Sequence, residues 1–160
     1  MTKTDPYRET DEAARALARR LITEAPYAAL SVLRAGTDLP SVSRVALATD
    51  HKNQPLTLIS DLSDHTRALR ANPNCALLIG EPEDKGDPLT YPRLTLHAVA
   101  RPVRRDTDEH DKIRARYLSL RPKAKLYVDF ADFSFVWFDV QDAVLNGGFG
   151  KAFRLSKADL

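Results

Sequence analysis

Apolar residues follow two different spacings along this chain, and each spacing indicates a type of secondary structure. Near the N-terminus they are three and four residues apart, which is the spacing of one face of an α-helix. Thr10 is a suitable N-cap for this helix, and Pro26 limits it at the other end. The pattern predicts a helix of about three turns that packs on a sheet as a lid. Its apolar positions are Ala14, Leu17, Ala18 and Leu21.

Most other apolar residues occur in short runs or alternate with polar residues, as they do in β-strands. Turns rich in Gly, Pro, Asn and Asp separate these runs. The predicted strands are residues 28–33, 41–48, 56–60, 75–79, 93–103 and 133–140, and 149–155 would return after a hairpin turn at Asn146-Gly147. Strands therefore outnumber helices, and their spacing favours a small antiparallel barrel over a doubly wound sheet.

Two further segments have helical character. Residues 64–71 lie between two predicted strands and end before Asn72-Pro73. Another helix begins at Asp106, where Glu109 stands three residues later in the arrangement of a capping box. After it, Pro122 can start a helical turn that runs towards Phe130. These helices would flank a fold that consists mainly of strands.

The bulk composition is ordinary for a globular protein and excludes several classes. The chain has 160 residues, of which 43% are hydrophobic and 29% charged, with a formal net charge of +2. We expect a single domain over residues 1–160, flexible at 1–9. The charge is too small for a nucleic-acid footprint, and no apolar run approaches the roughly 18 residues of a membrane helix. The N-terminus does not resemble a signal peptide and Cys75 has no disulfide partner, so we expect a cytoplasmic protein.

Hydroxyl and nitrogen-bearing side chains gather around the start of the predicted helix at 64–71. Ser60 ends the preceding strand, and Ser63 can cap the helix. His65 and Arg67 add donors beside the first backbone N–H groups, which have no partner within the helix and lie where its dipole favours an anion. The segment indicates either a phosphate cradle or a simple capped surface helix, and the residues alone favour neither.

Two other segments could contact a flat ligand. Alternation along strand 41–48 puts Arg44 on the same face as Val42 and two alanines, which leaves room beside a cation. An exposed arginine outside a barrel explains this pattern slightly better. Three glycines within residues 147–150 permit close approach by a ring, although a tight hairpin with a bulge also explains them. The four histidines lack metal-binding spacing, and we see no metal site.

Five stretches together resemble a known family across residues 20–155. They are Ser41–Asp50, Leu58–Thr66, Asn72-Pro73, Arg93–Leu96 and Gly147–Ala152. In order and spacing they are similar to the FMN-binding split barrels related to pyridoxamine 5′-phosphate oxidase, especially the bacterial branch that includes haem-utilisation proteins. The His-Thr pair and the Gly-Gly-Phe-Gly segment are the most specific parts of this resemblance.

The resemblance implies a mainly β fold, a six-stranded antiparallel Greek-key split barrel with flanking helices. It also implies a homodimer that holds FMN at the subunit interface and acts on a small-molecule substrate, with Trp137 near the dimer seam. Arg44 would reach the FMN phosphate, which Ser60, His65 and Thr66 would hold. The other implied contacts are the backbones of Val45, Ala46 and Leu47 along the ring, Arg93 near the pyrimidine, and Gly148, Phe149 and Lys151 near the ring.

The chain departs from the oxidases at positions that matter for their reaction. No lysine follows Arg44 in its strand, and Asp64-His65-Thr66 stands where the oxidases have Ser-Arg-Lys. We therefore do not expect oxidation of pyridoxamine phosphate. The expected function is that of an FMN-dependent oxidoreductase for a small or planar substrate, with no catalytic residue identified. The alternatives are a haem-binding or haem-degrading protein on the same scaffold and a non-catalytic flavin-binding dimeric module.

Overall fold

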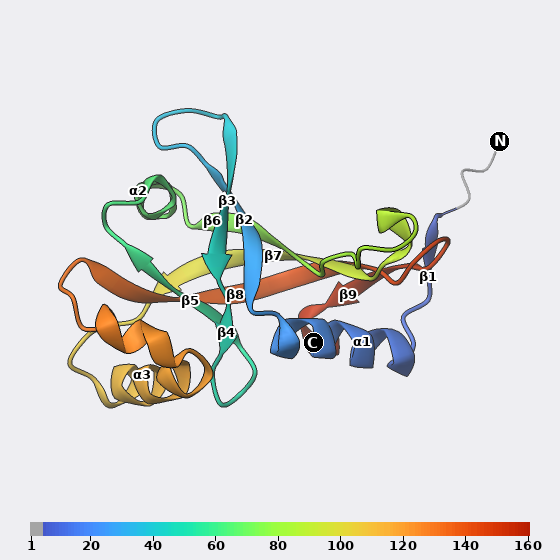
Figure 1. The fold of residues 1–160 in the computed structure, drawn as a ribbon. Helices are drawn as coiled ribbons and strands as arrows, with labels where there is room; N and C mark the ends of the chain where they lie inside the picture. The colour runs from blue at the N-terminus through green and yellow to red at the C-terminus, as the bar shows by residue number, and fades with distance from the viewer. Residues whose placement is uncertain (1–4) are drawn as a thin grey trace.

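The structure is a computed structural model that describes residues 5–160 (Figure 1). The helices within that range are α1 (Glu12–Glu24), α2 (Asp64–Ala71), α3 (Asp108–Leu120) and the short 3-10 segments η1 (Pro88–Thr90), η2 (Pro122–Leu126) and η3 (Lys157–Asp159). The strands are β1 (Tyr7–Arg8), β2 (Tyr27–Leu33), β3 (Pro40–Ala46), β4 (Ala48–Thr49), β5 (Pro55–Ser60), β6 (Asn74–Ile79), β7 (Arg93–Pro102), β8 (Phe133–Asn146) and β9 (Ala152–Ser156). Part of the segment expected to be flexible, residues 1–4, lies outside the described residues.

One sheet organises the chain. Its strands run in the order β1-β9-β8-β7-β6-β2-β3, while β5 pairs with β8 and with β4. All these pairs are antiparallel except β1 with β9. The prediction of a mainly β fold with flanking helices is confirmed, but the sheet of the described residues has nine strands instead of six. One reason is that the predicted strand 41–48 is interrupted at Leu47 and forms β3 and β4.

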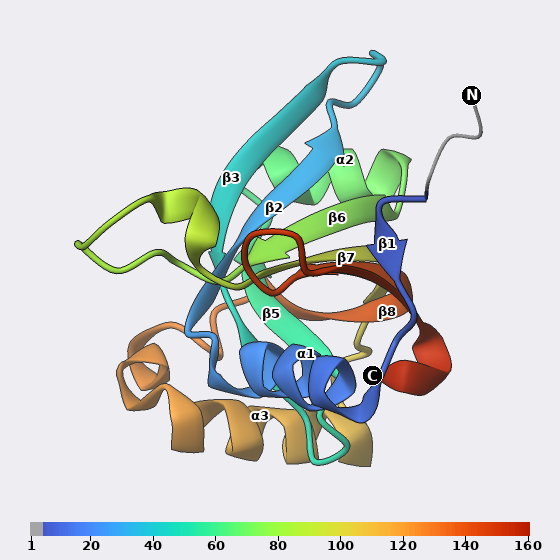
Figure 2. The same cartoon turned by 90° about the vertical axis from the view of Figure 1, so that its right-hand side faces the viewer.

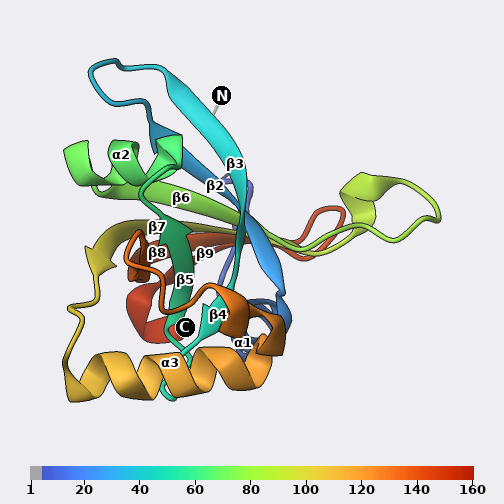
Figure 3. The same cartoon turned by 60° about the vertical axis from the view of Figure 1, so that its left-hand side comes forward.

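Two hydrophobic clusters fill the molecule. The larger one lies between the sheet and helices α1 and α2, and the smaller one lies under α3, between β4, β5 and β8. Figures 2 and 3 show α1 and α3 along one end of the sheet, with the β2–β3 hairpin projecting away from them. The loop between β6 and β7 projects sideways in both views.

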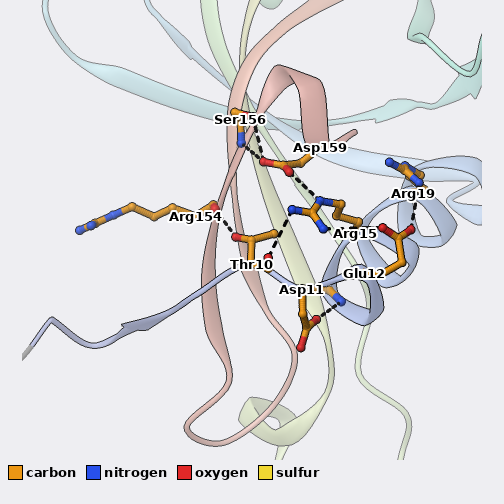
Figure 4. Close-up of polar contacts among 9 residues, drawn as sticks. Thr10, Asp11, Glu12, Arg15, Arg19, Arg154, Ser156 and Asp159 are labelled. Atoms are coloured by element: carbon orange, nitrogen blue, oxygen red, sulfur yellow. Dashed lines mark hydrogen bonds and ion pairs between the residues drawn. The ribbon is translucent and has the colours of Figure 1, made fainter.

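Helix α1 begins one residue later than the sequence predicts. Asp11 is its N-cap, and the Asp11 carboxylate accepts the Ala14 N–H at 2.8 Å. Thr10 instead donates its hydroxyl to the Arg154 carbonyl at 2.7 Å, which ties the start of the helix to β9 (Figure 4). The buried face of the helix consists of Ala14, Ala18 and Ile22. Helix α1 therefore covers the sheet, as its spacing predicts.

A polar clamp joins α1 to the segment that ends at Leu160. Arg15 Nε donates to Asp159 Oδ1 at 2.7 Å, and Asp159 Oδ2 accepts both the amide and the hydroxyl of Ser156 (Figure 4). The bond from Arg15, followed by those from Ser156, lowers the pKa of Asp159 to about 2. The clamp fixes η3 against the helix.

Helix α3 also starts differently from the prediction. Its N-cap is Thr107, whose hydroxyl accepts the His110 N–H at 3.1 Å. Asp106 was expected to be the cap, but its φ of 59° places it in the left-handed region, before the helix. The predicted capping box with Glu109 is therefore wrong by one position.

Among residues 5–160, no helix packs on the side of β3, β2, β6, β7 and β9 that faces away from the larger cluster, and we call this surface the open face; α3 covers the same side of β5 and of the first part of β8. Leu30, Leu77 and Leu155 on the reverse side are buried in the larger cluster with α1 and α2. In the strand register, one row across the open face is Arg44, Ala29, Leu78, Thr95, Val144 and Arg154. The next row is Val42, Ser31, Ala76, His97, Asp142 and Ser156. Leu78 is 45% exposed and Val42 is 67% exposed.

Candidate functional site

A cleft of about 530 Å³ lies between the β2–β3 hairpin and the first turn of α2. Its lining includes Val32, Arg34, Ser41, Ser43, Ser63 and His65. The short turn after β5 places the start of α2 beside β3, so the segment interpreted from the sequence as either a phosphate cradle or a capped surface helix lies at this cleft. We refer to it as the α2 cleft.

The start of α2 offers hydrogen-bond donors that the described residues do not use. Ser63 is the N-cap, but its hydroxyl makes no capping bond. Within residues 5–160, the backbone N–H groups of Asp64 and His65 meet no acceptor. Such groups at a helix N-terminus favour an anion. The Asp64 carboxylate opposes this charge, although it is paired with Arg67.

His65 lies at the wall of the α2 cleft. Its Nδ1 is 3.1 Å from Ser43 Oγ on β3. Burial lowers the pKa of His65 below its ordinary value, while the nearby Asp64 charge acts in the opposite direction. The lowered pKa favours the neutral imidazole, which can act in the cleft as a hydrogen-bonding group.

Ser60 and Thr66 use their hydroxyl protons inside the protein. Ser60 Oγ donates to Asp132 Oδ2 at 2.8 Å and accepts the Leu62 N–H at 3.1 Å. Thr66, only 3% exposed, donates to the Ser60 carbonyl at 2.6 Å. These bonds hold the corner between β5 and α2, and a phosphate contact by either residue stays a prediction.

Arg44 lies on the other side of β3 from Ser43. Its side chain is exposed on the open face, and its guanidinium carbon is 5.0 Å from the centre of the Tyr27 ring. The structure therefore does not place Arg44 in the α2 cleft of the same protomer. Of the two interpretations drawn from the sequence, this arrangement corresponds to the exposed arginine outside a barrel.

The backbone that follows Arg44 is held by side chains from β5 and from the end of α3. The Ala46 carbonyl accepts the Thr57 hydroxyl at 2.6 Å, and the Leu47 carbonyl accepts Arg121 Nη2 at 3.1 Å. The side chains of Val45 and Leu47 are buried in the larger cluster. Arg121 is a residue that the sequence analysis missed, because its contact with Leu47 joins positions 74 residues apart.

The other predicted ligand contacts lie on β7 and on the β8–β9 hairpin. Arg93 Nη1 donates to the Leu89 carbonyl at 3.0 Å, and Arg93 faces Asn146 across the strands. Gly148 has a φ of 122°, and a Cβ there would come within 3.0 Å of the Thr90 carbonyl oxygen. Phe149 is 95% exposed at the tip of the β8–β9 hairpin, where Lys151 is also exposed.

The expected site residues thus form three separate groups within one protomer: the α2 cleft, the open face at β3, and the β8–β9 hairpin. Elsewhere, burial raises the pKa of the Cys75 thiol to about 11, which makes it a poor nucleophile. Within residues 5–160, no cluster of three or more His, Cys, Asp or Glu side chains is placed to hold a metal ion. No helix in that range is long and apolar enough to cross a membrane.

Comparisons with known proteins relate this geometry to a family. Over 98 residues, 61% of this chain, the sequence is 43% identical to the non-canonical heme oxygenase HOZ, chloroplastic, of Arabidopsis thaliana. The match covers only 28% of that relative. The structure of a heme binding protein from Mycobacterium smegmatis superposes with a TM-score of 0.81 at 28% identity, covering 95% of this chain and 60% of the other.

A more distant structure shows the fold alone. A protein of the pyridoxinephosphate oxidase family from Clostridium acetobutylicum superposes with a TM-score of 0.69 at 12% identity, covering 94% of this chain and 99% of the other. The predicted resemblance to these split barrels is thereby confirmed. Residues 9–159 match the family described as "CREG, beta-barrel". The chain belongs to the CREG β-barrel family.

Proposed function

We propose that this protein binds haem, held between the two protomers of a homodimer. The observation that carries the proposal is the 43% identity over 98 residues to a protein named as a heme oxygenase. The 28% identity to a heme binding protein over nearly the whole chain supports it independently. Because the chain spans only part of each relative, haem degradation is a separate step of the proposal with its own test.

The open face suits a planar ligand. Haem is a flat, mostly apolar ring with two carboxylates at one edge. Ala29, Ala76 and Leu78 provide a floor of small and aliphatic side chains, and Arg44 stands at the β3 end of the same surface. Arginine is well suited to pair with carboxylates. The face supplies one wall only, so a second protomer would provide the other.

The expected site residues lie in separate places within one protomer, and this separation supports the same homodimer. In one protomer Arg44 lies on β3, at the end of the sheet path, and Phe149 lies at the tip of the β8–β9 hairpin. A two-fold arrangement brings the same surface of each copy against the other. Residues that are distant within one chain would then meet across the interface.

Titration with ferric haem tests the binding proposal. We expect saturable binding with a shift of the haem absorption band, and binding at least about tenfold weaker in Arg44→Ala, since a charge-assisted bond contributes about 1.5–3 kcal/mol. Arg20→Ala, an exposed arginine on α1, is the matched control and should bind like the parent protein. A flat titration of the parent protein rejects the proposal.

Degradation is tested on the haem-loaded protein with a chemical reductant and oxygen. Loss of the haem band with release of iron, faster than for free haem, supports oxygenase activity. A band that persists under these conditions rejects degradation and leaves a haem-binding protein.

FMN binding in the α2 cleft is the second candidate, and the free donors at the start of α2 favour it. The Ser63 hydroxyl and the amides of Asp64 and His65 fit one phosphate group. FMN, when bound, would supply the redox chemistry. These residues would orient its phosphate, and the neutral His65 would hydrogen-bond to it.

Riboflavin, which lacks the phosphate, gives a direct test of this candidate. Quenching of flavin fluorescence should show FMN binding at least about tenfold tighter than riboflavin binding, and Ser63→Ala should reduce that difference. Equal affinity for the two flavins would contradict phosphate recognition by α2.

The expected cytoplasmic location is also a proposal, which cell fractionation tests; the plant relative is named as chloroplastic.

A further inference from the structure

The end of α3 and the η2 turn that follows it expose apolar and basic side chains together. Leu120 is 46% exposed and Leu126 is 78% exposed. Lys123 and Lys125 are exposed on the same turn, and within residues 5–160 neither is paired with a carboxylate. We call residues 120–126 the η2 surface. Apolar side chains flanked by unpaired cations are suited to a partner that is partly apolar and acidic.

The η2 surface lies at the border of the open face. Arg121 Nη2 donates to the Leu47 carbonyl at 3.1 Å, and Leu47 directly follows β3, the strand at one end of that face. Helix α3 packs on the same side of β5 and β8. A second copy seated on the open face would therefore reach the η2 surface as well.

The β6–β7 loop, residues 80–92, has the opposite charge. It contains four carboxylates and one lysine, all of them exposed. Within residues 5–160 none of these carboxylates forms an ion pair. The same loop exposes 64% of Leu89, so it also combines apolar surface with charge. The carboxylates are Glu81, Glu83, Asp84 and Asp87.

Hydrogen bonds fix the shape of this loop. The Asp87 carboxylate accepts the Leu89 N–H at 2.8 Å, and the Tyr91 hydroxyl donates to the Lys85 carbonyl at 2.6 Å. A loop that is already ordered loses less conformational entropy when it binds. In Figures 2 and 3 the loop and the orange turns that follow α3 lie on the same side of the molecule. One partner could therefore contact both.

We propose that the β6–β7 loop of one protomer docks on the η2 surface of a second copy. This inference rests on the proposed homodimer and specifies contacts at the edge of its interface. The acidic loop would face Lys123 and Lys125, and Leu89 would meet the exposed Leu126. In a two-fold assembly the same contact forms twice. Opposite charges at the rim of an interface orient the two partners and exclude wrong ones.

Charge reversal on each side, followed by reversal on both, tests the docking. Sedimentation over a range of protein concentrations, with and without ferric haem, measures the dimer dissociation constant. We expect Glu83→Lys with Asp84→Lys to raise it at least about tenfold, and Lys123→Glu with Lys125→Glu to do the same. The variant that carries all four changes should recover most of the parent affinity, because opposite charges face each other again. Misfolded protein would show no such recovery.

Glu9→Lys with Glu24→Lys is the matched control for the loop variant. It makes the same change in net charge at exposed positions outside both surfaces, and it should keep the parent dissociation constant. An equal loss in this control would show an effect of net charge alone, and the docking would be wrong.

The measurement separates this inference from the proposed homodimer. If the parent protein dimerises but the reversals leave its dissociation constant unchanged, the docking is wrong while the homodimer stands. A four-change variant that dimerises no better than the two-change variants also rejects the docking. A parent protein that stays monomeric with and without haem rejects both proposals.

Discussion

At the residue scale, the sequence indicated which side chains could cap a helix or donate a hydrogen bond, but not which groups they bond to in the folded protein. Helix α2 has the predicted bounds, and Ser63 is its N-cap. The sequence could not show that Thr66 donates to the Ser60 carbonyl or that Ser60 bonds to Asp132, 72 positions away. Both hydroxyls were expected to bind phosphate, because the acceptors that they bond to within the protein are brought close only by the fold and cannot be seen in the sequence.

The bond from Thr66 to Ser60 gives a prediction about stability. Thr66→Val keeps the side-chain volume but removes one donor from the Ser60 carbonyl, which retains the Ser63 N–H, so we expect a loss of about 0.5–1.5 kcal/mol in the free energy of unfolding. Thr66→Ser keeps the hydroxyl and should lose less. Urea unfolding measures both. A Val variant as stable as the parent, or less affected than the Ser variant, would show that this bond does not hold the corner.

At the element scale, alternation located the strands but not their ends. Residues 133–140 were predicted as a strand, whereas β8 continues to Asn146. The reason is the bulge at Gln141, where the buried positions change from Val136, Phe138 and Val140 to Ala143 and Leu145. In a sequence, a break in the alternation of apolar and polar residues looks the same as the end of a strand. The hairpin at Asn146-Gly147 was recognised, but its return strand starts at Ala152, later than predicted.

The clamp between α1 and η3 predicts a pH dependence. The pKa of Asp159 falls from 3.8 to about 2 in the folded protein, so its contribution to stability is present above pH 3.8 and is lost as the pH falls towards 2. Asp159→Asn should therefore lower the urea midpoint near pH 7, and this difference from the parent should shrink below pH 4. Arg15→Gln should give the same pattern. A difference that stays constant down to pH 2.5 would contradict the assignment.

At the scale of the whole molecule, the family and the fold class were predictable from the sequence, whereas the positions of the expected site residues relative to one another were not. The resemblance identified the correct fold because the order of the motifs along the chain is retained when the residues between them differ. It did not show that Arg44, His65 and Phe149 lie apart in one chain, since that depends on which side of the sheet each occupies. In the proposed homodimer, the open face is the surface that both the second copy and haem would use.

The central claim is that two copies of this protein hold haem between them. Native mass spectrometry of protein mixed with equimolar ferric haem measures this directly, because it reports how much haem each oligomer retains. The account predicts a dimer peak that carries haem and a monomer peak that is free of it. Haem retained to the same extent on monomers, or absent from every species, would contradict the account.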